Sequence, residues 1–134
     1  MSGVVVAPVQ PAGWAAPKGY ANGMIGAGRV LAVAGQIGWD EACKLVPGGF
    51  VAQFDRALAN VAAVVVAGGG SVEGILSLTI YVTDKAVYAA ALKDVGAAYR
   101  RVMGRHYPAM ALVEVKGLLE PGAEVEIQAL AVVP

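Results

Sequence analysis

The 134-residue sequence predicts an α+β fold in which two helices cover one face of a mixed β-sheet. Short, β-branched apolar runs surround two longer segments whose apolar residues recur at helical spacing. The chain then ends in two further strand-like runs, so strands and helices do not alternate strictly. A chain of this length has room for one core, and we expect a single domain over residues 1–134.

The N-terminal 28 residues are rich in Gly, Pro and Ala. Residues 2–6 are expected to form an edge strand, and residues 8–17 an extended loop. Residues 30–34 are entirely apolar and end at Gly35, which is typical of a strand that is buried on both faces. The first confident strand therefore begins near residue 30.

The middle of the chain predicts a helix, a strand and a second helix. Residues 50–67 have apolar side chains at helical spacing and end at a triple glycine. These glycines follow a helix and precede no Lys-Ser pair, which argues against a phosphate-binding loop. Residues 75–82 alternate, with one face expected to consist of Leu76, Leu78, Ile80 and Val82. Asp84 is a candidate N-cap for a second helix that ends near Gly104.

Two strand-like runs close the sequence. Pro108 cannot donate a ladder hydrogen bond and keeps its predecessor extended, so it marks the entry to the first run. Residues 118–122 contain a Pro-Gly turn and predict a hairpin between this run and residues 124–130. By alternation, Glu124 and Glu126 share one face of the second run and its apolar residues share the other.

Composition limits the classes of partner. Apolar residues make up 57% of the chain and charged residues 15%, so we expect part of the surface to be covered in a homo-oligomer. Ten basic and ten acidic residues balance without a basic run, which gives no support to nucleic-acid binding. We expect no membrane span, because glycine or polar residues interrupt every apolar window. One cysteine and the lack of a signal sequence favour the cytoplasm, and a lone histidine favours neither a metal nor a cofactor.

Several motifs together resemble the Rid proteins, also called YjgF-like or L-PSP proteins. The matching stretches cover nearly the whole chain: Ala34-Gly35-Gln36-Ile37, Gln53 with Leu58, Asn60 and Val61, residues 78–84, Tyr107-Pro108-Ala109 with Val113-Glu114-Val115, and Val125-Glu126-Ile127 with Ala129 and Ala131. The resemblance implies a chorismate-mutase-like fold, assembly as a homotrimer, and small-molecule clefts between adjacent subunits.

The resemblance also implies roles for individual residues. Deaminating Rid proteins hydrolyse 2-imino or enamine acids, and a glutamate that matches Glu126 orients water. Tyr20 matches a cleft tyrosine, although its ring could instead pack on the sheet. Met110 replaces the arginine that clamps the substrate carboxylate, and Ala34 replaces a serine. The remaining predicted ligand contacts are Gln36 and Leu112, although the Gln36 amide could instead serve as a polar cap at the end of its strand.

Met110 changes the expected substrate. Methionine packs against apolar groups but carries no charge. Loss of a desolvated bidentate ion pair costs about 2–5 kcal/mol, so efficient hydrolysis of small 2-imino acids is not expected unless another group compensates. Arg105, His106 and Lys116 are the candidates for such compensation.

Two functional hypotheses remain open. Retention of Glu126 and Tyr20 favours a hydrolase that acts on an imine or enamine without a carboxylate anchor. The changes at Met110 and Ala34 favour a non-catalytic trimer that binds a small ligand. Glu126 could also be an exposed carboxylate that pairs with Lys116 across the predicted hairpin. Ribonuclease activity ranks last, because the chain is neutral and has one histidine.

Overall fold

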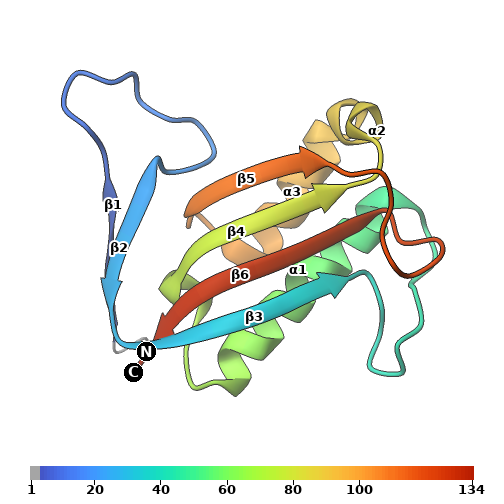
Figure 1. The fold of residues 1–134 in the computed structure, drawn as a ribbon, viewed down its shortest axis with the longest axis horizontal. Coiled ribbons are helices and arrows are strands. Elements are labelled where there is room, and N and C mark those ends of the chain that lie inside the picture. Colours follow the sequence, from blue (N-terminus) through green and yellow to red (C-terminus); the bar gives the residue numbers. More distant parts are fainter. Residues whose placement is uncertain (1–3) are drawn as a thin grey trace.

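A computed structural model describes residues 4–134 and confirms the α+β class. Helices α1 and α3 lie behind a four-stranded sheet, whose front face carries no helix from residues 4–134 (Figure 1). The elements in chain order are β1 (Val5–Val9), β2 (Gly23–Ala27), β3 (Arg29–Ile37), α1 (Phe50–Ala67), the 3-10 turn η1 (Val72–Gly74), β4 (Ile75–Val82), α2 (Lys85–Ala90), α3 (Leu92–Met103), β5 (Ala109–Glu114) and β6 (Val125–Val133).

The strand order in the main sheet is β3-β6-β4-β5, and only the β4–β5 pair is parallel. The predicted hairpin between the last two strands is wrong, because β4 lies between them. The Pro-Gly turn does form, with Gly122 at φ +87°. It is held by Gln53 of α1, whose side chain donates to the Gly122 carbonyl (3.0 Å) and accepts from the Glu124 amide (2.8 Å). The connection therefore passes over the end of β4 and is anchored on a helix.

Strands β1 and β2 form a separate antiparallel hairpin, which stands beside one end of the main sheet in Figure 1. The expected strand over residues 2–6 is displaced to β1, and residues 1–3 lie outside the described part of the chain. The loop expected over residues 8–17 begins only after Val9, and β2 was not predicted. Gly26 brings β2 close to the sheet, since a Cβ there would lie 3.1 Å from Leu76 and 3.3 Å from Val132.

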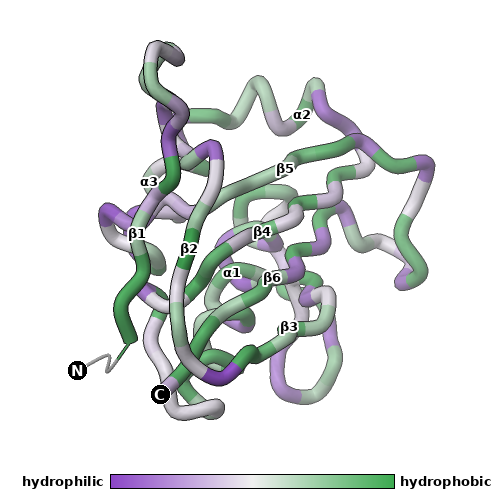
Figure 2. Tube along the Cα trace, turned by 60° about the vertical axis from the view of Figure 1, so that its left-hand side comes forward, coloured by the Kyte–Doolittle hydropathy of each residue, from purple (hydrophilic) through white to green (hydrophobic). Residues whose placement is uncertain are grey.

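The core lies between the sheet and helices α1 and α3. Strand β6 alternates as predicted, and Figure 2 shows hydrophobic residues along the central strands, with strongly hydrophilic residues mostly in loops and at element ends. In β4 the predicted alternation holds from Leu78 onward, but Leu76 is not in the core. A register shift between Ile75 and Ser77 puts Ile75 in the core and turns Leu76 toward the β1–β2 hairpin.

The second predicted helix is divided into α2 and α3. Asp84 caps α2 as predicted, with its carboxylate accepting from the amides of Ala86 (2.9 Å) and Val87 (3.4 Å). At Ala91 the chain leaves helical geometry, because its amide bonds to the Tyr88 carbonyl three residues back (3.1 Å). Helix α3 then runs to Gly104, where φ is +63°.

Helix α1 has the length and apolar composition to cross a membrane. Its buried residues pack into the core against the sheet, which accounts for its apolar face. These buried residues are Phe50, Gln53, Phe54, Ala57, Leu58, Val61 and Val65.

Replacing Gly96 of α3 by alanine is expected to stabilise the protein by about 0.5–1 kcal/mol, because glycine is a poor residue within a helix. An added Cβ would meet only the movable guanidinium of Arg100, at 3.3 Å. Urea unfolding at one fixed protein concentration measures the change. Gly38→Ala is the contrasting variant, since its Cβ would lie 2.5 Å from the Gln53 backbone and should destabilise. Lower stability in Gly96→Ala would contradict the packing described for α3.

Candidate functional site

Met110 lies in a groove between the edge strand β5 and helix α3. Met110 pairs with the buried Leu78 in parallel register, so its side chain is on the helix side of the sheet. Leu112 occupies the same face two residues on, and both side chains pack half-buried against the core. The groove has a volume of about 260 Å³ and is lined by Gly19, Phe54, Ile80, Tyr88, Leu92, Val95, Gly96, Tyr99, Arg100, Tyr107 and Met110.

Three tyrosines give this groove neutral polar walls. The Tyr99 hydroxyl donates to the His106 carbonyl at 2.6 Å, and its ring stacks on Tyr107 with 5.2 Å between centroids. Burial raises the pKa of both Tyr88 and Tyr99 above the usual tyrosine value, so both remain protonated at neutral pH. Among the described lining residues, Arg100 is the one charged side chain.

Glu126 lies on the opposite, helix-free face of the sheet. Its neighbours across the ladder are Tyr81 and Ile37. The carboxylate is half-buried and lies over Gly35, where a Cβ would be 2.7 Å from its Cδ. It opens into a pocket of about 400 Å³ that is lined by Gly35, Ile37, Trp39, Leu119, Glu120 and Glu126.

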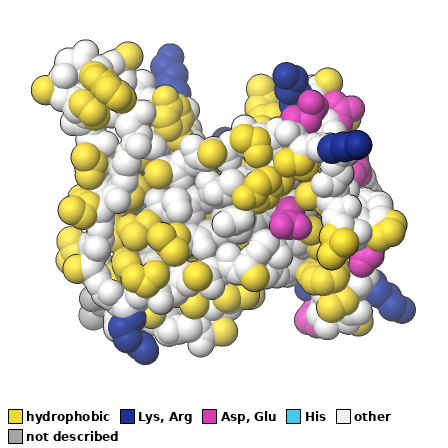
Figure 3. Space-filling model, in the orientation of Figure 1, with side chains coloured by type: hydrophobic (Ala, Val, Ile, Leu, Met, Phe, Trp, Pro, Cys, Tyr) yellow, Lys and Arg dark blue, Asp and Glu magenta, His cyan; other side chains and the backbone are white. Residues whose placement is uncertain are grey.

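The helix-free face is mainly neutral in Figure 3, where hydrophobic and uncharged atoms fill the centre and acidic side chains lie toward one end. Glu126 makes no ion pair with Lys116 in the described chain, and β4 separates their segments. The alternative in which these two residues pair across a hairpin is therefore wrong. Because Met110 and Glu126 are on opposite faces, one chain does not bring them into one site.

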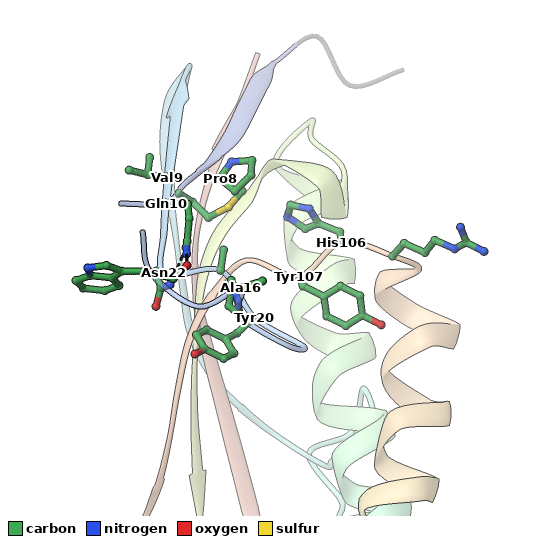
Figure 4. Close-up of a pocket in the computed structure, with 13 residues that line it drawn as sticks. Pro8, Val9, Gln10, Ala16, Tyr20, Asn22, His106 and Tyr107 are labelled. Atoms are coloured by element: carbon green, nitrogen blue, oxygen red, sulfur yellow. Dashed lines mark hydrogen bonds between the residues drawn. The ribbon is translucent and has the colours of Figure 1, made fainter. Parts of the chain in front are cut away.

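A third cavity, of about 520 Å³, lies under the β1–β2 hairpin and the segment that follows β1 (Figure 4). Tyr20 lines it together with Arg105, His106 and Tyr107. Tyr20 is 43% exposed, so it is only partly covered by its neighbours. His106 is tied to the Ile75 carbonyl through Nε2 at 2.8 Å. Arg105 and His106 are thus grouped with Tyr20, while Met110 lies in the adjoining groove.

Local contacts hold this cavity next to the groove. The side-chain amide of Asn22 donates to the side-chain oxygen of Gln10 at 2.7 Å, the contact dashed in Figure 4. The Ala21 amide donates to the Pro108 carbonyl at 3.0 Å, which places the Tyr20 segment beside the start of β5. Tyr107 lines both the cavity and the groove, so the two spaces share a wall.

Ala34 and Gln36 lie in the irregular part of β3, where the register shifts between Val33 and Gln36. The Gln36 side chain donates to the Ala34 carbonyl at 3.1 Å, and the residue lines a surface pocket together with Asn60 and Val64 of α1. Gln36 is thus committed to a local strand-end contact. No cluster of three or more metal-ligating side chains occurs within residues 4–134.

Sequence reasoning missed Arg100. Its signal is the four-residue spacing of Leu92, Gly96 and Arg100, which places all three on one stripe of α3. Only the folded structure shows that this stripe of α3 lines the same groove as Met110 of β5.

Gly35→Ala is expected to reorient Glu126, because the new Cβ would overlap the carboxylate. If Glu126 acts on a substrate, turnover should fall roughly tenfold to a hundredfold, since a displacement of about 1 Å is enough for such a loss. Steady-state kinetics should show the loss mainly in kcat. Unchanged kcat would contradict a role for the present Glu126 position. Gly117→Ala is the matched control, because no atom lies within 4 Å of its added Cβ and its φ is outside the left-handed region.

Comparison with known proteins identifies a family model and relatives that agree with one another. Residues 12–133 match the family model described as Endoribonuclease L-PSP. RutC family protein UK114 of Drosophila melanogaster is 33% identical over 135 residues, which cover 98% of this chain and 92% of that protein. A 2-iminobutanoate/2-iminopropanoate deaminase of Capra hircus is 33% identical over 105 residues, or 78% of this chain and 73% of that protein.

Solved structures agree with the sequence relatives. YyfB of Yersinia pestis, described as a protein of unknown function of the conserved Rid protein family, superposes with a TM-score of 0.80 at 28% identity and covers 96% of this chain and 98% of that chain. The YjgF gene product of E. coli gives a TM-score of 0.66 at 31% identity, over 84% of this chain and 87% of its own.

Proposed function

This chain belongs to the endoribonuclease L-PSP family, which includes the Rid proteins, and we propose that it is a homotrimeric hydrolase of small imines or enamines. The observation that carries the proposal is the placement of Glu126 and Met110 on opposite faces of one sheet. If both line one cleft, they come from two subunits. The Met110 groove of one subunit then meets the Glu126 pocket of the next.

Assembly of this kind joins two different surfaces, and repeated heterologous contacts of suitable rotation close into a ring. The helix-free face supports such contacts, because it exposes small and apolar side chains. Val113 is 43% exposed, Leu130 40% and Leu119 99%, although all three are hydrophobic. Burial of these side chains against a neighbouring subunit would remove apolar surface from water.

The chemistry is addition of water to a carbon–nitrogen double bond. Glu126 accepts a proton from water while the water oxygen bonds to the imine carbon. The imine nitrogen takes up a proton, which gives a carbinolamine. That intermediate releases ammonia as its hydroxyl proton is lost and the carbonyl forms. An imine and one water are thus converted into a carbonyl compound and ammonia. No redox partner is required.

Ammonia release from freshly generated 2-iminobutanoate, and from an imine without a carboxylate, tests the activity. Wild type is compared with Met110→Arg, and the mass in solution is measured on the same samples. Release above the uncatalysed rate by a species of three chains supports the proposal. A monomer, or wild type and Met110→Arg that release nothing from either substrate, would rule it out.

A second candidate is a non-catalytic trimer that binds a small ligand. It is favoured by the apolar residues Met110 and Ala34, at positions where the resembled family carries an arginine and a serine. Saturable binding of an uncharged carbonyl compound without ammonia release would select this candidate.

A further inference from the structure

We infer that Arg100 on α3 is the carboxylate anchor of the Met110 groove, in place of an arginine on strand β5. The inference rests on the proposed intersubunit cleft and specifies its substrate class as small carboxylates with a short apolar chain. The positive charge in this groove is then supplied by the Arg100 guanidinium of α3 instead of by an arginine of strand β5.

Gly96 makes this position of Arg100 possible. Leu92, Gly96 and Arg100 follow one another at four-residue spacing along the groove. One guanidinium nitrogen, Nη1, lies 3.3 Å from the point where a Cβ of residue 96 would be. The side chain therefore folds back along the helix and lies over the glycine as part of the groove wall. Residue 96 contributes no side chain that would fill this space.

The charge distribution in the groove favours an anion. Arg100 is its only charged lining residue among those described, and no acidic side chain lines it. Arg100 forms no ion pair in the described chain, whereas the adjacent Arg101 lies 3.6 Å from Asp55. A guanidinium without a carboxylate partner offers two parallel donors to a substrate carboxylate.

The remaining walls suit a short hydrocarbon chain. Met110, Leu92 and Val95 provide apolar surface around a volume of about 260 Å³. Methionine adapts its shape to an irregular apolar group. A carboxylate at Arg100 would leave the other end of a small acid free to meet the partner subunit's Glu126.

Binding of butanoate and of its neutral isostere butanamide tests the inference by calorimetry on the wild-type oligomer. Wild type should prefer butanoate, and Arg100→Gln should bind butanoate about tenfold or more weakly, because a hydrogen bond to a charged group is lost. Affinity for butanamide should change little. Arg101→Gln is the matched control, with the same charge change one residue away and no expected effect. Arg100→Lys should retain part of the preference, because its charge remains without the planar fork.

Equal butanoate affinity in wild type and Arg100→Gln would overturn the inference, as would a wild type that does not distinguish butanoate from butanamide. The hydrolase proposal is tested separately by ammonia release. Ammonia release from an imine without a carboxylate, together with equal binding of butanoate and butanamide, would contradict the role of Arg100 as an anchor and support the hydrolase proposal. Butanoate binding that depends on Arg100, without ammonia release from any imine, would support the anchor and contradict the hydrolase proposal. Thermal unfolding of each variant separates loss of binding from loss of fold.

Discussion

Glu126→Gln is expected to lower the rate of ammonia release from imines by roughly 10²- to 10⁴-fold, which is the usual contribution of a positioned general base. Glutamine keeps the size and hydrogen-bonding atoms of the side chain but cannot accept a proton from water. Glu126 is half-buried beside Gly35, so the replacement fits the same space. Stopped-flow or coupled ammonia assays measure the rate at saturating substrate.

Glu73→Gln is the control for this change, because Glu73 is an exposed carboxylate on η1, outside the Glu126 pocket. It should retain the wild-type rate. Comparable rates in Glu126→Gln and wild type would mean that another group activates water. The role assigned to Glu126 would then be lost.

Gln53→Ala is expected to lower the free energy of unfolding by about 2–4 kcal/mol, since loss of a buried partner costs about 1–3 kcal/mol per group left unpaired. Gln53 is 5% exposed and satisfies both the Gly122 carbonyl and the Glu124 amide. Without it, the segment that leads into β6 loses its anchor on α1. Urea unfolding at a fixed protein concentration measures the loss.

Gln36→Ala provides the comparison, because Gln36 makes one local bond to Ala34 at the surface. Its effect should be within about 0.5 kcal/mol, as for most surface changes. If both variants lost the same stability, the buried clamp at Gln53 would not be what holds this loop.

Local signals predicted those elements whose ends are set by nearby residues. Helix α1 begins at Phe50 and ends at Ala67 as predicted, because its apolar spacing stops at a run of glycines. Strand β5 starts directly after Pro108, which cannot donate to the ladder. Asp84 caps α2 through its own carboxylate. In each case the deciding contact lies within a few residues of the chain.

Strand pairing could not be predicted in the same way. The Pro-Gly turn at Gly122 suggested a local hairpin, but β5 pairs in parallel with β4, more than 25 residues earlier in the chain. Strand β2 carries two glycines and lacks the alternation of a typical strand, so its pairing with β1 was invisible in the sequence. Long-range packing decides both pairings.

The resemblance proposed site residues one by one, but it did not predict how they divide between the two faces of the sheet. Resemblance pointed to Tyr20, Met110 and Glu126 without showing that the last two face opposite sides of the sheet. Arg100 carried no motif, and its relation to Met110 depends on how α3 packs beside β5. A family motif assigns roles only to residues at matching positions in the sequence. A residue from a different element, such as Arg100 on α3, can be linked to the site only when the folded structure is known.

Mixed oligomers test the central claim, that each active cleft combines Glu126 of one subunit with the groove of its neighbour. Glu126→Gln is combined by unfolding and refolding with Gly96→Leu, whose side chain would fill the groove. Each variant alone should be inactive. In a random equal mixture, about a quarter of head-to-tail clefts receive an intact Glu126 and an intact groove, and ammonia release should recover in that proportion. A mixture no more active than its parents would contradict a site shared between subunits.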